Sequence, residues 1–200
     1  IYRGLVGSEM CIRDRSIITC FSKDRLLIFT DLGRVYGLKA WEIPQGSRHS
    51  RGTHIRNLLE NLQDDENIVS ILPISKELVD DVMERCLKVK LEEGEKRPPS
   101  GYFLLFATKL GLIKKTDLHE YVRINRNGKY ALRFKLENDS LVNVQQSVDS
   151  DDVVMISTTG YASRFKCDAI RTSGRVSGGV YGIKVAAVSY THLTLPTSVP

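Results

Sequence analysis

The chain has 200 residues, a formal charge of +5 and a hydrophobic content of 42%. This length allows one domain of ordinary size, and the hydrophobic content excludes a chain that is disordered throughout. No apolar run reaches about eighteen residues, which excludes a membrane-spanning helix, and no secretory signal pattern is visible. The mild basic excess permits a nucleic-acid partner but does not require one.

The two ends differ from the interior. Residues 1–15 and 188–200 do not continue the interior pattern and look like translated sequencing-adapter read-through. We expect both to be artefactual tails and exclude them from the fold prediction, as one excludes an expression scar. Residues 16–187 then form the natural part, and the natural protein is expected to continue beyond it in both directions.

The interior begins with a pattern of short apolar strands and glycine turns. We expect a strand over Ser16–Phe21 and then a hairpin over Leu26–Ile43 that turns at Gly33. A polar loop up to Gly52 and a further strand over Thr53–Leu59 follow. Glycine suits such turns because hairpin turns require positive φ.

The same pattern returns twice, with 49 residues between the turn glycines Gly111 and Gly160. Four short strands at a period near 50 residues are typical of propeller blades. We therefore predict an all-β fold, a partial β-propeller of about three four-stranded blades; a β-sandwich is the alternative, but it does not explain the repeat. The further elements expected are strands over Asn67–Ile74, Lys129–Leu136, Ser140–Val148 and Val180–Val185, and hairpins over Phe103–Tyr121 and Val153–Ile170.

A charged insertion, residues 75–100, lengthens the connection between the first two hairpins. Its first part, Lys76–Lys90, has the spacing of an amphipathic helix, and Pro98 and Pro99 end any helix there. We expect it to pack on a blade edge, with partner binding as an alternative. The predicted apolar stripe consists of Leu78, Val82, Cys86 and Val89.

The sequence predicts no catalytic residue and no metal site. It contains neither a phosphate-binding GxxxxGK[ST] loop nor a GxSxG nucleophile turn, and its four cysteines and four histidines have no zinc spacing. We expect His119 to be structural and the cluster Asp149, Asp151 and Asp152 to be a solvated turn.

Basic residues recur in the second strand of each hairpin, in the loop that follows and in the next strand. In a radial array such residues can form a belt on the rim that contacts DNA phosphates without reading bases. Ordinary solvated charge is the alternative. The predicted DNA-binding residues are Arg34, Lys39, Arg48, Arg51, Arg56, Lys114, Lys115, Arg123, Arg126, Arg133, Arg164, Lys166, Arg171, Arg175 and Lys184.

These segments resemble the C-terminal domain of the DNA gyrase A subunit over Arg25–Leu59, Phe103–Tyr121 and Val153–Val185, most specifically in the run Gly33–Pro44. The resemblance implies a β-pinwheel, a propeller variant whose blades exchange strands with their neighbours. It also implies that duplex DNA bends around the basic rim.

The resemblance further implies a non-catalytic part of a bacterial, cytoplasmic and nucleoid-associated type II topoisomerase. Its partners would be double-stranded DNA, the gyrase B subunit and a second A subunit, in an A2B2 complex that supercoils DNA negatively. No cofactor is expected in this fragment, because ATP and Mg²⁺ act elsewhere in that complex. The glutamine-arginine-glycine box and the catalytic tyrosine of the family are absent from this sequence and are expected upstream.

Two other functions remain open. The A subunit of topoisomerase IV has a related but shorter propeller, although the run Glu42–Leu59 favours gyrase. A protein-interaction propeller is the other alternative, and the missing WD and kelch signatures count against it. Three isolated blades would expose strand edges, so we expect residues 16–185 alone to be poorly soluble.

Overall fold

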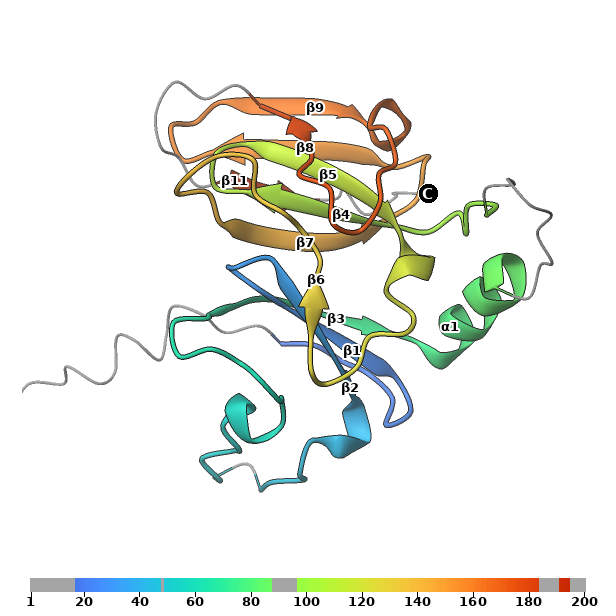
Figure 1. Cartoon of the computed structure of the whole chain (residues 1–200), viewed down its shortest axis with the longest axis vertical. Coiled ribbons are helices and arrows are strands. Elements are labelled where there is room, and N and C mark those ends of the chain that lie inside the picture. Colours follow the sequence, from blue (N-terminus) through green and yellow to red (C-terminus); the bar gives the residue numbers. More distant parts are fainter. Residues whose placement is uncertain (1–16, 48, 88–96, 184–190, 195–200) are drawn as a thin grey trace, which may run out of the picture.

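The computed structural model describes residues 17–47, 49–87 and 97–183, together with the backbone of residues 191–194. These residues form three antiparallel sheets (Figure 1). The predicted all-β class is confirmed, with one short helical segment between the first two sheets. In these described ranges no helix has the length and apolar character needed to cross a membrane.

Blade 1 is the sheet with strand order β3-β1-β2-β6. Its hairpin, β1 (Arg25–Thr30) and β2 (Arg34–Lys39), turns at Gly33, whose φ of 73° is strained for any residue with a side chain. The outer strands are β3 (Ile68–Ile74) and the two-residue β6 (Lys129–Tyr130).

Blade 2 repeats this arrangement with strand order β10-β5-β4-β7. Its hairpin consists of β4 (Phe103–Thr108) and β5 (Leu112–Asp117), with β7 (Leu141–Ser147) beside β4 and β10 (Val180–Tyr181) beside β5. The predicted turn glycine, Gly111, again has a positive φ, of 81°.

Blade 3 contains the third hairpin, β8 (Asp152–Ser157) and β9 (Ala162–Lys166), which turns at Gly160 with φ 89°. Strand β11 (Thr191–Thr194) pairs with β8, in the position that β3 and β7 hold in the other blades. This strand belongs to the terminal tract 188–200, which is expected to be an artefactual tail. The other tail, residues 1–15, lies outside the described residues.

Each of the first two blades is closed by a short strand from the following repeat. The carbonyl oxygen of Gly33 accepts hydrogen bonds from the backbone N–H groups of Ala131 (2.8 Å) and Leu132 (3.1 Å). The carbonyl oxygen of Gly111 accepts the equivalent bonds from Gly182 (3.0 Å) and Ile183 (3.3 Å). This is the strand exchange of a β-pinwheel.

Two predicted strands are wrong. Residues 17–21 have no regular structure, and the predicted strand Thr53–Leu59 contains a 3-10 turn, Ile55–Asn57, instead. Its counterparts in the second and third repeats pair with the preceding blade, whereas the residues that the structure describes contain no blade before the first repeat. The segment instead forms a local turn, in which Nδ1 of His54 accepts a hydrogen bond from the Arg56 N–H (3.2 Å).

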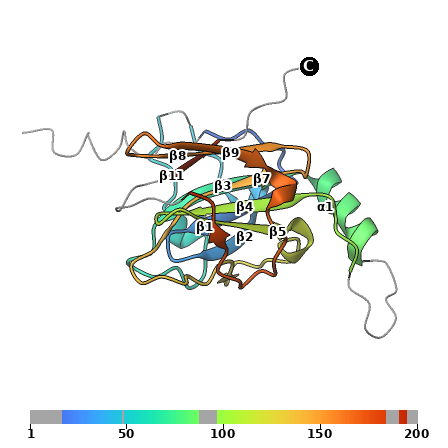
Figure 2. The same ribbon diagram turned by 90° about the horizontal axis from the view of Figure 1, so that it is seen from above.

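The insertion forms helix α1 (Lys76–Val82), which continues as a single π-helical turn, Met83–Leu87. Its N-cap is Ser75, whose hydroxyl accepts a hydrogen bond from the Leu78 N–H (3.2 Å). Val82 is buried in the core, so the helix packs on the edge of the blades (Figure 2). Residues 88–96, including Val89 of the predicted stripe, lie outside the described residues.

Blade 2 has a hydrophobic core on each of its faces. Because successive side chains of a strand point to opposite faces, Leu104 and Phe106 of β4 join the core shared with blade 1. Leu105 and Ala107 join the core shared with blade 3, where they pack with buried residues such as Met155. Both faces of its central strands, β4 and β5, are therefore covered.

Candidate nucleic-acid interface

Exposed basic side chains without an acidic partner are the best candidates for contacts with phosphate. Of the fifteen predicted basic residues, Arg48 and Lys184 lie outside the described residues. Five of the others are exposed. Within the residues that the structure describes, none of these five forms an ion pair with a carboxylate. These five, which we call the free basic set, are Lys39, Arg51, Arg123, Arg133 and Arg171.

Four further exposed basic residues are paired with carboxylates. Asp152 binds both Arg164 (2.5 Å) and Lys166 (3.1 Å), and these two cations hold the pKa of Asp152 below its ordinary value. The remaining pairs are Arg126 with Glu42 (2.6 Å) and Arg56 with Asp64. Binding of a phosphate here would compete with an existing partner, so these residues are weaker candidates.

Arg34 and Arg175 are partly buried and take part in the local fold. The Arg34 guanidinium donates a hydrogen bond to the carbonyl oxygen of Asn61 (3.2 Å) and lies 3.6 Å from the buried carboxylate of Glu66. It also lies over the ring of Tyr36, 5.2 Å from the ring centroid. Arg175 lies 3.9 Å from Glu120.

Lys114 and Lys115 do not lie on a surface belt, which corrects the prediction for these two residues. They are only 2% and 3% exposed. The Lys114 ammonium donates hydrogen bonds to the carbonyl oxygens of Ala131 (2.6 Å) and Arg175. The Lys115 ammonium pairs with Asp149, donates to the carbonyl oxygen of Cys167 (3.1 Å), and lies 4.2 Å from the centroid of the Phe103 ring.

The position of blade 2 explains this burial. All six residues of β5 are buried, because this strand belongs to the sheet with a core on each face. A lysine on either side of the strand therefore points into an inter-blade space, where it binds backbone carbonyl groups instead of solvent.

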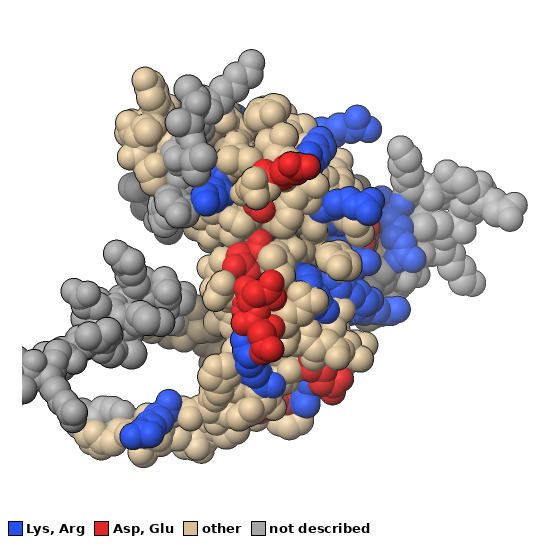
Figure 3. All heavy atoms as spheres, turned by 60° about the vertical axis from the view of Figure 1, so that its left-hand side comes forward, with Lys and Arg blue, Asp and Glu red and all other residues tan. Residues whose placement is uncertain are grey.

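Positive charge is also interrupted on part of the surface. On the face shown in Figure 3, acidic side chains form a column, and basic side chains gather beside it. Basic side chains therefore do not form one continuous belt over this face.

A basic pocket that the sequence did not predict lies between blade 1 and the insertion helix. It has a volume of about 530 Å³, and we call it the α1 pocket. Two members of the free basic set, Lys39 and Arg123, line it. The pocket is lined by Lys23, Arg25, Lys39, Trp41, Lys76, Val79, Met83, Val122 and Arg123.

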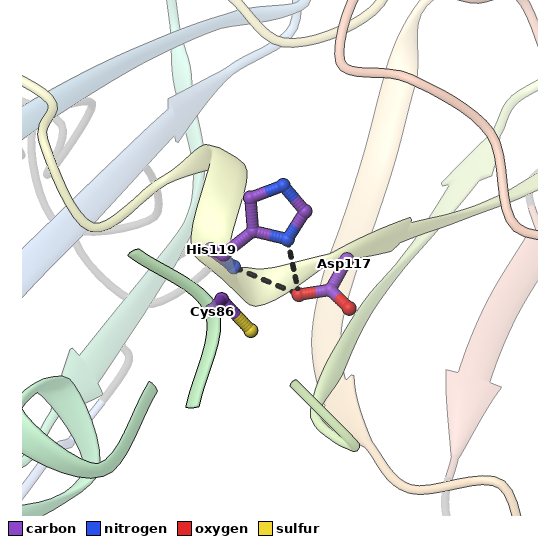
Figure 4. A group of neighbouring side chains, drawn as sticks. All are labelled: Cys86, Asp117 and His119. Carbon is purple, nitrogen blue, oxygen red and sulfur yellow. Dashed lines mark hydrogen bonds and ion pairs between the residues drawn. The ribbon is translucent and has the colours of Figure 1, made fainter. Parts of the chain in front are cut away.

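A second unpredicted group joins the insertion to blade 2. Each of Cys86, Asp117 and His119 offers one potential ligand atom, and the three atoms lie within 4.8 Å of one another (Figure 4). The Asp117 carboxylate already accepts hydrogen bonds from the N–H (2.8 Å) and hydroxyl (2.6 Å) of Ser100 and from the N–H of His119 (2.9 Å). It also lies 2.8 Å from Nδ1 of His119.

The pKa directions in this group favour a structural role over a metal centre. Burial alone would raise the pKa of Asp117, but the hydrogen bonds from His119 and Ser100 outweigh it and lower that pKa. Asp117 in turn raises the pKa of His119, and burial raises the pKa of the Cys86 thiol. The aspartate is thus committed to protein donors and the thiol is kept protonated, whereas metal binding requires free carboxylate oxygens and a thiolate.

Comparison with known proteins gives a consistent result across all three blades. The chain matches the family described as "DNA gyrase C-terminal domain, beta-propeller" over residues 24–75, 102–147 and 151–187. It is 38% identical over 185 residues to a protein of Deinococcus deserti that is named as the A subunit of DNA gyrase. That match covers 92% of this chain, which spans about a fifth of the length of this relative.

Solved structures share the fold. The C-terminal domain of a DNA topoisomerase IV superposes with a TM-score of 0.69 and 24% identity, covering 88% of this chain and 48% of the other. A DNA gyrase A C-terminal domain superposes with a TM-score of 0.61 and 22% identity, covering 86% of this chain and 48% of the other. These two likenesses establish the β-pinwheel fold.

Proposed function

Because this chain belongs to the DNA gyrase C-terminal domain family, we propose that it is the DNA-binding and DNA-wrapping part of the A subunit of a bacterial gyrase. The observation that carries the proposal is that the family match extends over all three blades. The free basic set supplies side chains of the kind that bind phosphates without selecting a sequence.

Gyrase is favoured over topoisomerase IV by the sequence relatives. Proteins named as the A subunit of DNA gyrase match the chain at 34 to 38% identity, while the solved topoisomerase IV and gyrase A domains, at 24% and 22% identity, do not separate the two. In the whole protein we place this part in the cytoplasm, within an A2B2 complex that supercoils DNA negatively. The DNA-cleaving tyrosine, and the sites for ATP and Mg²⁺, would belong to other parts of that complex.

The test compares duplex binding at several salt concentrations. The variant replaces Arg51, Arg133 and Arg171 with glutamate, which leaves the α1 pocket unchanged. The slope of log affinity against log salt is expected to fall by about one for each phosphate that is no longer bound, and two unrelated duplex sequences should bind alike. The control replaces Arg85 and Arg97 of the insertion with glutamine.

Fluorescence anisotropy of a labelled duplex would measure both variants. An affinity and salt slope in the triple variant equal to those of the unmodified chain would contradict DNA binding through these residues. If the control variant binds as weakly as the triple variant, the loss of affinity reflects net charge in general and not contacts at a defined surface.

A further inference from the structure

The α1 pocket is formed by three segments that are tied together by hydrogen bonds. Nη1 of Arg25 donates to the carbonyl oxygens of Val122 (2.6 Å) and Ile124 (3.0 Å), which joins β1 to the loop after β5. The backbone N–H of Lys76 donates to the Asp24 carboxylate (3.3 Å), which joins the start of α1 to the start of β1. The pocket walls are therefore fixed within the fold.

The charged side chains that line the pocket are all cationic, and the nearby carboxylates of Asp24 and Glu42 are not part of the lining. Five cationic residues line it, and its lining contains no carboxylate. Arg25 is engaged with backbone carbonyl groups, but no described carboxylate forms an ion pair with the other four, which are Lys23, Lys39, Lys76 and Arg123. Like charges brought together in this way repel one another, and a bound anion relieves that repulsion.

The lining of the pocket also contains one aromatic and several apolar residues. Trp41 lies in the 3-10 turn after β2, and its backbone N–H donates to the carbonyl oxygen of Ser22 (3.0 Å). The residue remains 60% exposed, although burial would stabilise so large a ring. Val79 and Met83 of the insertion add apolar side chains to the lining.

We propose that the α1 pocket binds a nucleotide unit, an aromatic base that carries phosphate. The four free cations would bind the phosphate, and Trp41 would stack on the base, as aromatic side chains do in sites for unpaired nucleotides. A volume of about 530 Å³ suits a small ligand and is far too small for a double helix. The site shares Lys39 and Arg123 with the free basic set, whereas Arg51, Arg133 and Arg171 lie outside it, so the two kinds of binding can be tested separately.

Trp41 gives a direct measurement, because it is the only tryptophan in the 200 residues. The full chain, fused to a solubility partner that lacks tryptophan, would be titrated with ATP and with a short single-stranded oligonucleotide. Quenching of the Trp41 fluorescence that saturates is expected with at least one of them. ATP alone would identify a free nucleotide as the ligand, and the oligonucleotide alone would identify an unpaired strand.

Two further ligands separate the roles of base and phosphate. Adenosine should bind at least roughly tenfold more weakly than ATP or the oligonucleotide, because it lacks phosphate. Inorganic triphosphate should compete with the quenching ligand while quenching little by itself. Quenching by adenosine at the same concentrations, or saturable quenching by neither nucleotide probe, would overturn the proposal.

Variants locate the site. Lys39→Gln combined with Lys76→Gln should weaken binding by roughly tenfold or more, whereas Lys129→Gln, an exposed lysine outside the pocket, should not change it. Equal affinities in all three proteins would overturn the proposal. Stronger competition by a glutamate-rich peptide than by either nucleotide probe would also overturn it, in favour of an acidic protein segment. The rim variant at Arg51, Arg133 and Arg171 should bind nucleotide normally, so that a failure of either function can be recognised separately.

Discussion

The ring of Phe29 in blade 1 lies edge-on against the ring of Phe106 in blade 2, with 5.5 Å between the ring centroids and 82° between the ring planes. Tyr121 lies beside both, at 6.2 Å from Phe29 and 5.8 Å from Phe106. All three side chains are fully buried. This aromatic group is the centre of the core that joins the first two blades.

Removal of one ring from this group should destabilise the fold strongly. Phe106→Ala is expected to lower the free energy of unfolding by about 3–5 kcal/mol, because it leaves a cavity between two blades. Urea unfolding followed by circular dichroism would measure it. The control is Tyr161→Ala, since Tyr161 is 70% exposed and its loss should cost little. Similar losses in both variants would contradict the assignment of this core.

Gly37 is expected to tolerate no side chain. A Cβ atom at this position of β2 would lie 2.2 Å from the carbonyl oxygen of Ile124, in a backbone segment that Arg25 holds in place. Gly37→Ala should therefore lower the thermal midpoint clearly, because backbone has to move. In the matched control, Gly174→Ala, the new atom would have nothing within 4 Å. Equal thermal midpoints for the two variants would show that the backbone around Ile124 can move at little cost in stability.

Lys114 should make stability depend on pH above neutrality. Burial lowers the pKa of Lys114 to about 7. Between about pH 7 and the ordinary lysine value of about 10.4, the unfolded chain therefore binds more protons than the folded chain. The free energy of unfolding should consequently rise with pH in this window, by up to about 1.4 kcal/mol per pH unit.

Lys114→Met should flatten that dependence. Urea unfolding at several pH values between about 7 and 9.5 would compare the variant with the unmodified chain, over the range where lysine linkage acts. Lys129→Met, at an exposed lysine, is the control and should keep the original dependence. Parallel curves for the Lys114 variant and the unmodified chain would mean that the buried ammonium stays charged throughout.

His119 should make the free energy of unfolding fall as pH rises, the opposite of the effect expected from Lys114. Its hydrogen bond with Asp117 raises the pKa of His119, so the stability it adds is complete below about pH 6.5 and is lost as pH rises through the raised value. The lowered pKa of Asp117 means that its own contribution is lost only as pH falls through that lowered value. In the unmodified chain, the free energy of unfolding should fall between slightly acidic and slightly basic pH. His119→Gln should remove this fall.

An NMR titration of the imidazole would check this directly. The His119 ring is expected to titrate above the ordinary histidine pKa, and Asp117→Asn should bring its pKa down. A His119 ring that titrates at or below the ordinary value would exclude the ion pair with Asp117.

The hairpins could be predicted because their signals are local. An apolar strand, a glycine and a second strand suffice, and Gly33, Gly111 and Gly160 have the positive φ that the pattern requires. The short exchanged strands could not be placed in this way. Lys129–Tyr130 owes its strand structure to pairing with Arg34 and Val35, which lie far back in the sequence.

The burial of basic residues also could not be predicted from local sequence. Lysine in a strand normally indicates a solvated face, but Lys114 and Lys115 lie in a sheet that is covered on both sides. That covering exists only once three blades are stacked. The α1 pocket and the Cys86–Asp117–His119 group were missed for a similar reason, because the packing of the insertion brings their residues together.

The closing strands also determine the order in which the blades can form during synthesis. The carbonyl oxygen of Gly33 finds its partners in Ala131 and Leu132, which leave the ribosome only after the hairpin of the next repeat. Blade 1 therefore waits, with one edge unpaired, until most of the second repeat has been translated, and blade 2 waits in turn for the third. Because such long-range pairing is slow, completion of each blade is expected to lag about one repeat behind translation, and a ribosome stalled within a repeat would hold an open blade.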